Sequence, residues 1–189
     1  MLSLGGDAAL SLFRDRVPEF HCSITMSIAL QAVSAWDASS LRAFGISVLG
    51  DSPYPEPMLA ALDAALGRES DEYRGIVASD DGALAGLIVF GAMPGALGTG
   101  RIHLVAVRPE TRRRGIARDL IDAACAWLGE RGGRLTMIEL AADPWFEAAQ
   151  QLARRTGFRE EGRIDGYVRD GAALLLLRRD LQVLPRGAS

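Results

Sequence analysis

The sequence predicts a single domain of the α/β (α+β) class, with a mixed, mostly antiparallel sheet of about six to seven strands and helices on both faces. Its 189 residues, 49% hydrophobic and 24% charged, suit one ordinary globular domain. Apolar residues recur in turn at a spacing of two, typical of strands, and at the helical spacing of about 3.6. We expect the domain to span residues 26–182, after an extension, residues 1–25, that the native fold does not require, and before a tail, residues 183–189.

Each element is predicted from its apolar period and from the residues at its ends. The expected elements are, in chain order, a strand over 26–34, a helix from Asp37 or Ser39 to Gly50, a loop over 50–57, a helix over Leu59, Leu62 and Leu66 to Gly67, a hairpin over 74–94, a strand over 101–107, a helix from 115 to Gly132, a strand over 134–140, a helix from Asp143 to Gly157, and strands near 159–168 and 172–181.

The helix boundaries follow from capping residues. Asp37 and Ser39 are both candidates for the N-cap of the first helix, because a short polar side chain there accepts a bond from an unpaired amide. Asp143 followed by Pro144 is typical of a cap and a first-turn proline. Between the first two helices, GDSPYPEP has three prolines in eight residues, which predicts a loop.

The strands are separated by turn signals. SDDG, residues 79–82, predicts a hairpin turn between two apolar strands, and RDG separates the last two strands. Pro109 prevents a simple continuation of the strand over 101–107. No repeat or low-complexity tract interrupts this order, so one layered domain is expected.

Charge and composition exclude several classes of function. A net charge of -3 argues against nucleic acid as the main partner, because such binding needs broad basic surface. No apolar run approaches the ~20 residues of a membrane span, and the N-terminus lacks the pattern of a signal peptide, so we expect a cytoplasmic location without membrane contact. Cys22 and Cys125 lie far apart and outside any CxxC pattern, which predicts no metal site and, at Cys125, a buried inert thiol.

The segment RPETRRRGIARDLI, residues 108–121, places three arginines before the first turn of an amphipathic helix. Cations near a helix N-terminus are disfavoured by roughly 0.3 to 1 kcal/mol each. An anion bound at that terminus would make the interaction of the nearby cations favourable instead. Gly115 lets the backbone approach such an anion closely. A solvated charge run is the alternative, but a strand, an Arg-rich turn and a long helix together favour a phosphate site.

This segment resembles the acyl-coenzyme A site of the GNAT superfamily of N-acetyltransferases. The family hallmark is Gln or Arg, two residues, Gly, one residue, then Gly or Ala, and Arg112, Gly115 and Ala117 occupy those positions. The strand ending VAVRP, the pair Gly157-Phe158 and the order of elements match as well. The resemblance implies a GNAT-like acyltransferase fold and acetyl-coenzyme A as co-substrate. It implies cofactor binding by Val105, Ala106, Val107, Arg112, Arg113, Arg114, Gly115, Ile116 and Ala117.

The same resemblance implies that amides from residues 113–117 hold the pyrophosphate and that residues 105–107, on a strand splayed from its neighbour, pair with the pantetheine arm. His103, two residues before this stretch, matches one of the paired histidines of arylalkylamine N-acetyltransferases. A neutral imidazole can accept the proton of an attacking amine, and a histidine that merely packs in the strand is the alternative. Because side chains alternate along a strand, Arg101 lies on the same face as His103, and its positive charge favours the neutral form of the histidine. A second hypothesis is that Arg101 binds a carboxylate of the substrate.

The chain departs from the family at two positions. Many members carry a tyrosine four residues before the Gly of GF and an asparagine seven residues further back, where this sequence has Ala153 and Phe146. Tyr167 is the remaining hydroxyl that we consider for the leaving thiolate, with a half-buried sheet tyrosine as the alternative. Glu139 and Tyr54 are candidate acceptor residues; the alternatives are a solvated strand end or helix-entry charge for Glu139, which the sequence favours, and an ordinary surface loop for Tyr54.

These observations predict an N-acetyltransferase that moves an acetyl group from acetyl-coenzyme A to a primary amine of a small molecule, amino acid or peptide. Direct attack in a ternary complex is expected, since the sequence has no GxSxG nucleophile motif. The alternative is a non-catalytic acyl-coenzyme A binding or sensing domain. A homodimer formed by edge pairing of the apolar strand over 172–181 is a further hypothesis.

Overall fold

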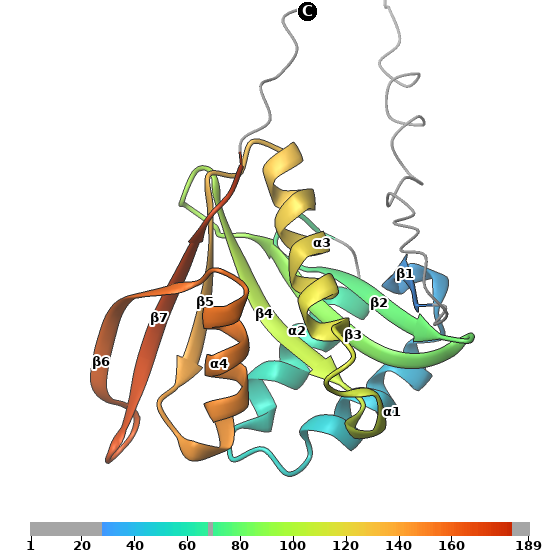
Figure 1. Ribbon diagram of the computed structural model, residues 1–189, viewed down its shortest axis with the longest axis horizontal. Helices are drawn as coiled ribbons and strands as arrows, with labels where there is room; N and C mark the ends of the chain where they lie inside the picture. The colour runs from blue at the N-terminus through green and yellow to red at the C-terminus, as the bar shows by residue number, and fades with distance from the viewer. Residues whose placement is uncertain (1–27, 68–69, 183–189) are drawn as a thin grey trace, which may run out of the picture.

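The computed structural model describes residues 28–67 and 70–182 as one mixed sheet with helices packed on it (Figure 1). The predicted extension, residues 1–25, with Cys22, and the tail, residues 183–189, lie outside the described residues. The sheet has seven strands in the order β1-β2-β3-β4-β5-β7-β6. Among the described residues, no helix has the length and apolar character needed to cross a membrane.

The strands are β1 Ile28–Ala32, β2 Arg74–Asp80, β3 Ala83–Ala92, β4 Thr99–Val107, β5 Leu135–Ala141, β6 Arg159–Arg169 and β7 Ala172–Asp180. The helices are α1 Ala38–Leu49, α2 Pro55–Gly67, α3 Ile116–Glu130 and α4 Glu147–Arg155, with short 3-10 turns at Val33–Ala35, Pro109–Thr111 and Pro144–Phe146. The predicted order of elements is therefore confirmed.

Strand pairing is antiparallel throughout the described sheet except between β4 and β5. The parallel register of that pair runs from Thr99 opposite Leu135 to Ile102 opposite Ile138 and stops there. Beyond it the two strands diverge toward the lower edge of the sheet in Figure 1. The prediction of a mixed, mostly antiparallel sheet is thus confirmed, and the only parallel pair among the described strands is the one that opens.

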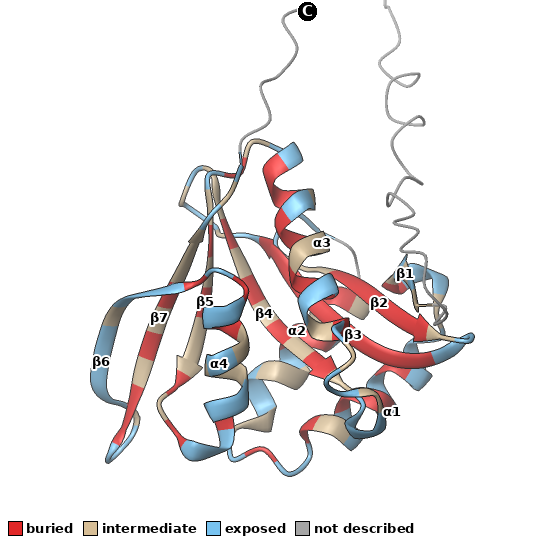
Figure 2. Cartoon of the chain, viewed as in Figure 1, coloured by how far each residue is buried: buried red, intermediate tan, exposed pale blue. Residues whose placement is uncertain are grey.

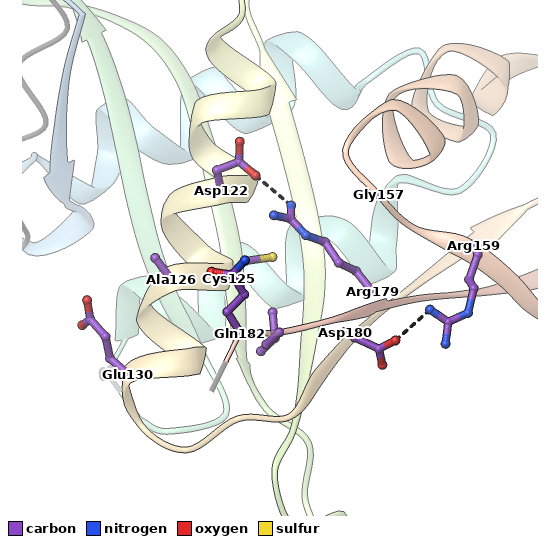
Figure 3. Close-up of a pocket in the computed structure, with 10 residues that line it drawn as sticks. Asp122, Cys125, Ala126, Glu130, Gly157, Arg159, Arg179, Asp180 and Gln182 are labelled. Atoms are coloured by element: carbon purple, nitrogen blue, oxygen red, sulfur yellow. Dashed lines mark hydrogen bonds and ion pairs between the residues drawn. The ribbon is translucent and has the colours of Figure 1, made fainter. Parts of the chain in front are cut away.

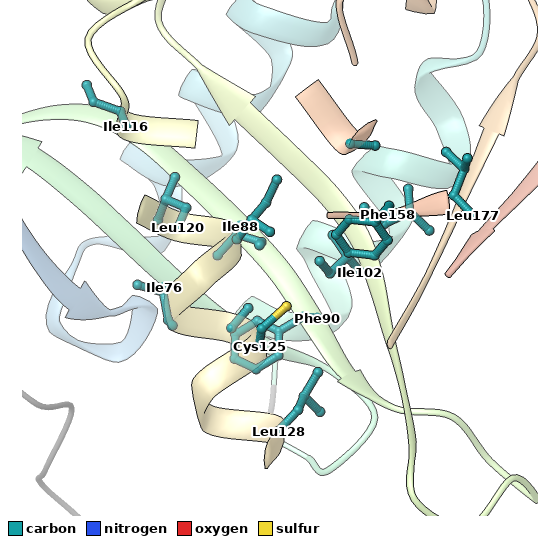
Figure 4. Packing of buried hydrophobic residues seen from close by; sticks show 14 of the residues in the cluster. Ile76, Ile88, Phe90, Ile102, Ile116, Leu120, Cys125, Leu128, Phe158 and Leu177 are labelled. Carbon is teal, nitrogen blue, oxygen red and sulfur yellow. The ribbon is translucent and has the colours of Figure 1, made fainter. Parts of the chain in front are cut away.

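Helices cover both faces of the sheet, as predicted (Figure 1). On one face, α3 buries Leu120 and Ile121 against Ile88 and Phe90 of β3 in a cluster that also takes in α4 (Figure 4). On the other face, α1 and α2 bury residues such as Leu41 against the opposite side of β2, β3 and β4. Figure 2 shows the buried stripe of α3 turned toward the sheet, the pattern of an amphipathic helix.

The predicted loop over residues 50–57 is wrong in its second half, because α2 begins at Pro55 and contains Pro57. Proline is tolerated in the first turn of a helix, where the missing N–H has no intrahelical partner to lose. At the first helix, Asp37 rather than Ser39 is the N-cap, and its carboxylate accepts from the amide of Ser40 at 2.8 Å. That hydrogen bonding, first from the Ser39 hydroxyl, lowers the pKa of Asp37 to about 2.

Two strand predictions also need correction. The strand expected over residues 26–34 ends at Ala32, where a 3-10 turn begins, and its first two residues lie outside the described part. The last strand, β7, is not an edge: it lies between β5 and β6. The apolar sequence of β7 reflects its burial between these two strands. Because β6 forms that edge of the sheet, the hypothesis of subunit pairing through the edge of β7 is wrong.

Candidate active site

The turn before α3 has the backbone geometry of an anion site. Arg113 and Gly115 both have left-handed backbone angles, with φ of 63° and 87°. Arg114 between them does not, and such alternation turns successive amides toward one concavity. The amides of Arg118 and Asp119 are the first to bond within the helix, at 2.8 and 3.0 Å from the Gly115 carbonyl oxygen. The amides of residues 115–117 therefore precede the first intrahelical bond and point outward.

The three arginines of this turn have different partners. The guanidinium of Arg114 makes a two-point contact with the Asp80 carboxylate of β2, at 2.6 and 3.0 Å, and the pair is largely shielded from solvent. Arg112 is exposed and donates from Nε to the carbonyl of Val107 at 3.2 Å. Arg113 is exposed. Among these three predicted cofactor residues, then, the side chain of Arg114 fastens the turn to the sheet, while Arg112 and Arg113 lie at the surface.

Gly115 is required by the turn for its backbone angle. A Cβ placed there would meet no atom closer than Asp119 Oδ2, at 3.9 Å. The space over the turn is therefore open in the described chain, but φ of 87° is unfavourable for any other residue. Ile116, the next predicted residue, is buried in the core under α3, so only its backbone can contact a ligand, whereas Ala117 is half-buried.

The opening between β4 and β5 leaves one edge of β4 unpaired within the described sheet. Val105, Ala106 and Val107 pair with β3 on one side, and the register with β5 has already ended at Ile102. A strand edge without a neighbour presents N–H and C=O groups to any extended ligand. The structure thus has the splayed strand that the resemblance implied at residues 105–107.

A β-bulge lies at the start of this opening. Val89 is opposite Leu104 and Phe90 is opposite Ile102, so His103 is the extra residue on β4. Ile102 consequently belongs to the core under α3, while Leu104, two residues on, belongs to the core under α1 and α2. Bulges of this kind redirect side chains next to functional sites. Here the bulge sets His103 where β4 leaves β5.

The His103 ring is held by contacts to the segment before β2. Its Nε2 lies 3.1 Å from the carbonyl oxygen of Glu72, and the ring stacks on Tyr73 with centroids 4.7 Å apart. Because a carbonyl oxygen only accepts, Nε2 carries the hydrogen, and Nδ1 is the basic atom of the neutral ring. The pKa of His103 is lowered, first by burial and then by Arg101, against a smaller opposing effect of the Glu72 bond. The predicted effect of Arg101 is confirmed in direction.

Arg101 and Glu139, both predicted as substrate residues, form an ion pair across the apex of the opening. Arg101 Nη2 lies 2.7 Å from Glu139 Oε2. Arg101 lies in the stretch of β4 that pairs with β5, and Glu139 directly follows Ile138, the last residue of β5 that pairs with β4. Both neighbours, Ile102 and Ile138, belong to the core under α3, so the pair lies on the α1 and α2 face.

Tyr54 lies in a separate cluster at the loop between α1 and α2. Arg169, at the end of β6, donates from Nε to the Tyr54 hydroxyl at 2.7 Å and from Nη2 to Asp143 at 2.7 Å. Asp143 also caps the turn before α4, and its pKa is lowered, first by the Trp145 amide and then by Arg169. The cluster joins three segments far apart in sequence. Sequence reasoning missed Arg169, and no local pattern marks it.

Tyr167, the remaining candidate for protonating the leaving thiolate, lies at the surface. Tyr167 is 65% exposed, in the part of β6 where the register with β7 is interrupted. Ala153 and Phe146, at the family's tyrosine and asparagine positions, are both buried. The described residues contain no group of three or more His, Cys, Asp or Glu side chains that could hold a metal.

A hollow of about 570 Å³ lies away from these residues, between the C-terminal half of α3 and the end of β7 (Figure 3). Its charged lining is engaged in ion pairs: Arg179 contacts Asp122 at 2.7 Å, and Arg159 contacts Asp180 at 2.8 Å. Cys125 lines it as well, but burial raises the pKa of this thiol to about 11, which keeps it protonated. The prediction that Cys125 is buried is confirmed, and the hollow contains no predicted site residue.

Comparison with known proteins gives a family assignment. Residues 32–158 match the model of the Acetyltransferase (GNAT) family. A protein from Desulfovibrio desulfuricans assigned to that family has a similar structure, with a TM-score of 0.74 and 22% identity over 82% of this chain and 100% of that one. The ribosomal-protein-S18-alanine N-acetyltransferase of Escherichia coli gives a TM-score of 0.66 and 14% identity over 86% of this chain and 99% of that one.

A third structure contains a ligand. A protein from Bacillus anthracis Ames, assigned as a streptothricin acetyltransferase and in complex with acetyl coenzyme A, has a TM-score of 0.55 and 17% identity over 60% of this chain and 65% of that one. No curated protein sequence matches the chain significantly. At these identities the structures establish the fold, and the family model, which spans well over half of the chain, establishes the family. The chain therefore belongs to the GNAT superfamily of acyltransferases, whose members take the acetyl group from acetyl-coenzyme A.

Proposed function

We propose that this protein is an N-acetyltransferase that moves an acetyl group from acetyl-coenzyme A to a primary amine of a small molecule, amino acid or peptide, in a cytoplasmic setting. One observation carries the proposal: the described sheet opens between β4 and β5, and His103 is set by a bulge at the point where the strands part. A basic nitrogen held neutral beside an open strand edge suits proton removal from an amine that attacks a bound thioester.

In this proposal the donor is bound mainly by backbone groups. The amides of residues 113–117, of which those of 115–117 point outward, hold the pyrophosphate, and the open edge of residues 105–107 pairs with the pantetheine arm. Arg112 and Arg113 add positive potential from the surface, while Arg114 contributes through its backbone and by fixing the turn to Asp80. Because the amides are fixed before the ligand arrives, little ordering is needed on binding.

His103 has the role of proton acceptor. An alkylamine with a pKa near 10.4 is less than about one part in a thousand neutral at pH 7, so a base speeds the attack. The amine nitrogen bonds to the thioester carbonyl carbon while its proton passes, directly or through water, to Nδ1 of His103. The carbon–sulfur bond then breaks and the electron pair leaves on sulfur. No group of the protein becomes acetylated in this sequence.

The leaving thiolate needs only modest help. Ala153 and Phe146 cannot donate a proton, which is the observation that favours a non-catalytic acyl-coenzyme A binding domain as the second candidate. A thiol with a pKa of about 8.5 leaves readily as the thiolate, however, and can take its proton from water. We include Tyr167 as a candidate donor because its hydroxyl is solvent-accessible on the strand next to β7. Tyr54, Arg101 and Glu139 are proposed as acceptor residues.

Two measurements test the proposal. Thermal unfolding is followed with acetyl-coenzyme A, coenzyme A, ATP and NAD, since a ligand at 100 times its Kd stabilises the native state by about 2.7 kcal/mol. Thiol release is then assayed over amines, amino acids and peptide N-termini. Stabilisation by the two coenzyme A forms together with thiol release supports the enzyme. Stabilisation without thiol release favours the binding domain, and no stabilisation by either form contradicts both.

A further inference from the structure

The ion pair of Arg101 and Glu139 has more binding capacity than its single contact uses. A guanidinium has five N–H donors, and within the described residues the structure gives Arg101 one hydrogen bond, to Glu139. The two side chains remain 37% and 29% exposed. An ion pair in contact with solvent contributes little to stability, so the fold alone gives weak reason for two opposite charges at this point.

A simple amine would use only one of the two charges of this pair. An alkylamine is an ammonium ion when it arrives at neutral pH, so it can bind the Glu139 carboxylate but leaves the Arg101 guanidinium without a partner from the substrate. Arg101 also lowers the pKa of His103, two residues away on β4, after the larger effect of burial. A substrate that carries a carboxylate next to its amine uses both charges, because its carboxylate can bind Arg101 through two parallel hydrogen bonds.

We propose that Arg101 and Glu139 together bind the zwitterionic end of a free α-amino acid, with the substrate carboxylate on Arg101 and its ammonium group on Glu139. The two charges of the pair are adjacent, which matches an amine and a carboxylate separated by one carbon and not those of a longer ω-amino acid. The bound ammonium first loses one proton to water, and the neutral amine then attacks the thioester carbonyl carbon while its second proton passes to His103 and the thiolate leaves. This inference rests on the proposed N-acetyltransferase function and narrows its acceptor to one chemical class.

The test compares matched acceptors. Thiol release from acetyl-coenzyme A is measured with L-alanine, L-leucine, L-phenylalanine and L-lysine, each beside its α-amide, at pH 8.5, where His103 is neutral with or without Arg101. We expect kcat/KM of the wild type for the best free acid to exceed that for its amide by about 10- to 100-fold, the value of charge-assisted hydrogen bonds. Arg101→Gln is expected to lose most of this preference, seen as a rise in KM for the free acid relative to KM for its amide.

Arg42→Gln is the matched control. Arg42 contacts Asp63 at 2.8 Å in an exposed pair between α1 and α2, and its loss leaves the acid preference unchanged. Equal use of acids and amides by the wild type, turnover of no free amino acid, or an Arg101→Gln enzyme that keeps the acid preference overturns the inference. Thiol release with amides or plain amines leaves the proposed function standing in each case. Failure of acetyl-coenzyme A to bind at all contradicts the proposed function itself.

Discussion

The two halves of the candidate site are constructed differently. The turn before α3 takes its shape from six consecutive residues, 112–117, whose left-handed angles at Arg113 and Gly115 arise within the turn. The opening between β4 and β5 depends instead on groups brought together by the sheet: Arg101 and His103 from β4, Glu139 from β5, and the segment before β2 that holds the His103 ring.

This difference separates a turn that depends on backbone geometry from an opening that depends on the identity of its side chains. A turn that binds with backbone amides tolerates many side chains, and its few requirements, above all Gly115, stand at a fixed spacing in the sequence. In the proposed mechanism the opening acts through side chains, and their placement depends on a bulge, an ion pair and a stacked ring. We therefore expect substitutions in the turn to change donor binding, and substitutions in the opening to change rate and acceptor choice.

The largest effect is expected at Gly115. Gly115→Glu places a carboxylate in the open space over the turn and forces a left-handed angle on a residue with a Cβ, so acetyl-coenzyme A affinity should fall at least about 100-fold, with a loss of about 1 to 2 kcal/mol in unfolding free energy. Titration calorimetry and denaturant unfolding measure the two. Gly82→Glu is the control, because Gly82 has φ of 80° and equally open space in the β2–β3 turn.

Gly82→Glu should lose similar stability and keep full donor affinity. If both variants bind acetyl-coenzyme A equally weakly, the loss reflects backbone strain and the turn is not the donor site.

The next effect is expected at His103. His103→Ala should lower kcat by about 100-fold or more and leave the Kd of acetyl-coenzyme A unchanged, because the base is lost and the donor contacts are not. In the wild type, the rate should rise with pH through a pKa below the ordinary value of 6.5 for histidine, since only the neutral ring accepts a proton and burial favours that form. This acidic limb should vanish in the variant.

His103→Gln tests the role of His103 as a base more specifically than the alanine variant does. Its amide can keep the hydrogen bond to the Glu72 carbonyl but cannot take a proton, so it should be as slow as the alanine variant. Recovery of the rate by glutamine would show that His103 acts by position and would remove it as the base.

The fold was largely predictable because it is encoded in local periodicity. The apolar stripe of α3 and the alternation along β4 are properties of short segments, and they fixed the order and type of the elements. The errors arose where tertiary context overrides a local signal. Pro55 and Pro57 suggested a loop but suit the first turn of α2, and the apolar run of β7 suggested an exposed edge but reflects burial between two strands.

The parts of the site that depend on local sequence were predictable, and the parts that depend on contacts between distant segments were not. The spacing of Arg112, Gly115 and Ala117 identifies the turn, and a single histidine on the right strand draws attention to His103. No local pattern shows that β4 stops pairing with β5 at Ile102, because that depends on register between distant segments. The partnership of Arg169 with Tyr54, whose positions differ by 115 residues, is invisible for the same reason.

A smaller effect, on stability, should distinguish Arg114 from Arg113 in the turn before α3. Arg114→Gln leaves the shielded Asp80 carboxylate without its two-point partner and should lower unfolding free energy by about 1 to 2 kcal/mol, less than for a fully buried pair because both groups keep some solvent contact. Arg113→Gln, at an exposed side chain, should change stability by less than about 0.5 kcal/mol and weaken donor binding a few-fold. Denaturant unfolding and donor titration of both variants measure this; equal stability losses would contradict the distinction.

The smallest effect is expected at Tyr167. If its hydroxyl protonates the leaving thiolate, Tyr167→Phe should lower kcat by less than about tenfold, because a thiol with a pKa near 8.5 is a good leaving group and water reaches a side chain that is 65% exposed. Steady-state rates and the alkaline limb of the pH profile measure it. An unchanged kcat and alkaline limb would remove Tyr167 from the mechanism and assign the proton to water. A fall beyond about 100-fold would mean instead that the β6 segment closes over the opening during turnover, since a solvated hydroxyl cannot account for so large a share of the rate.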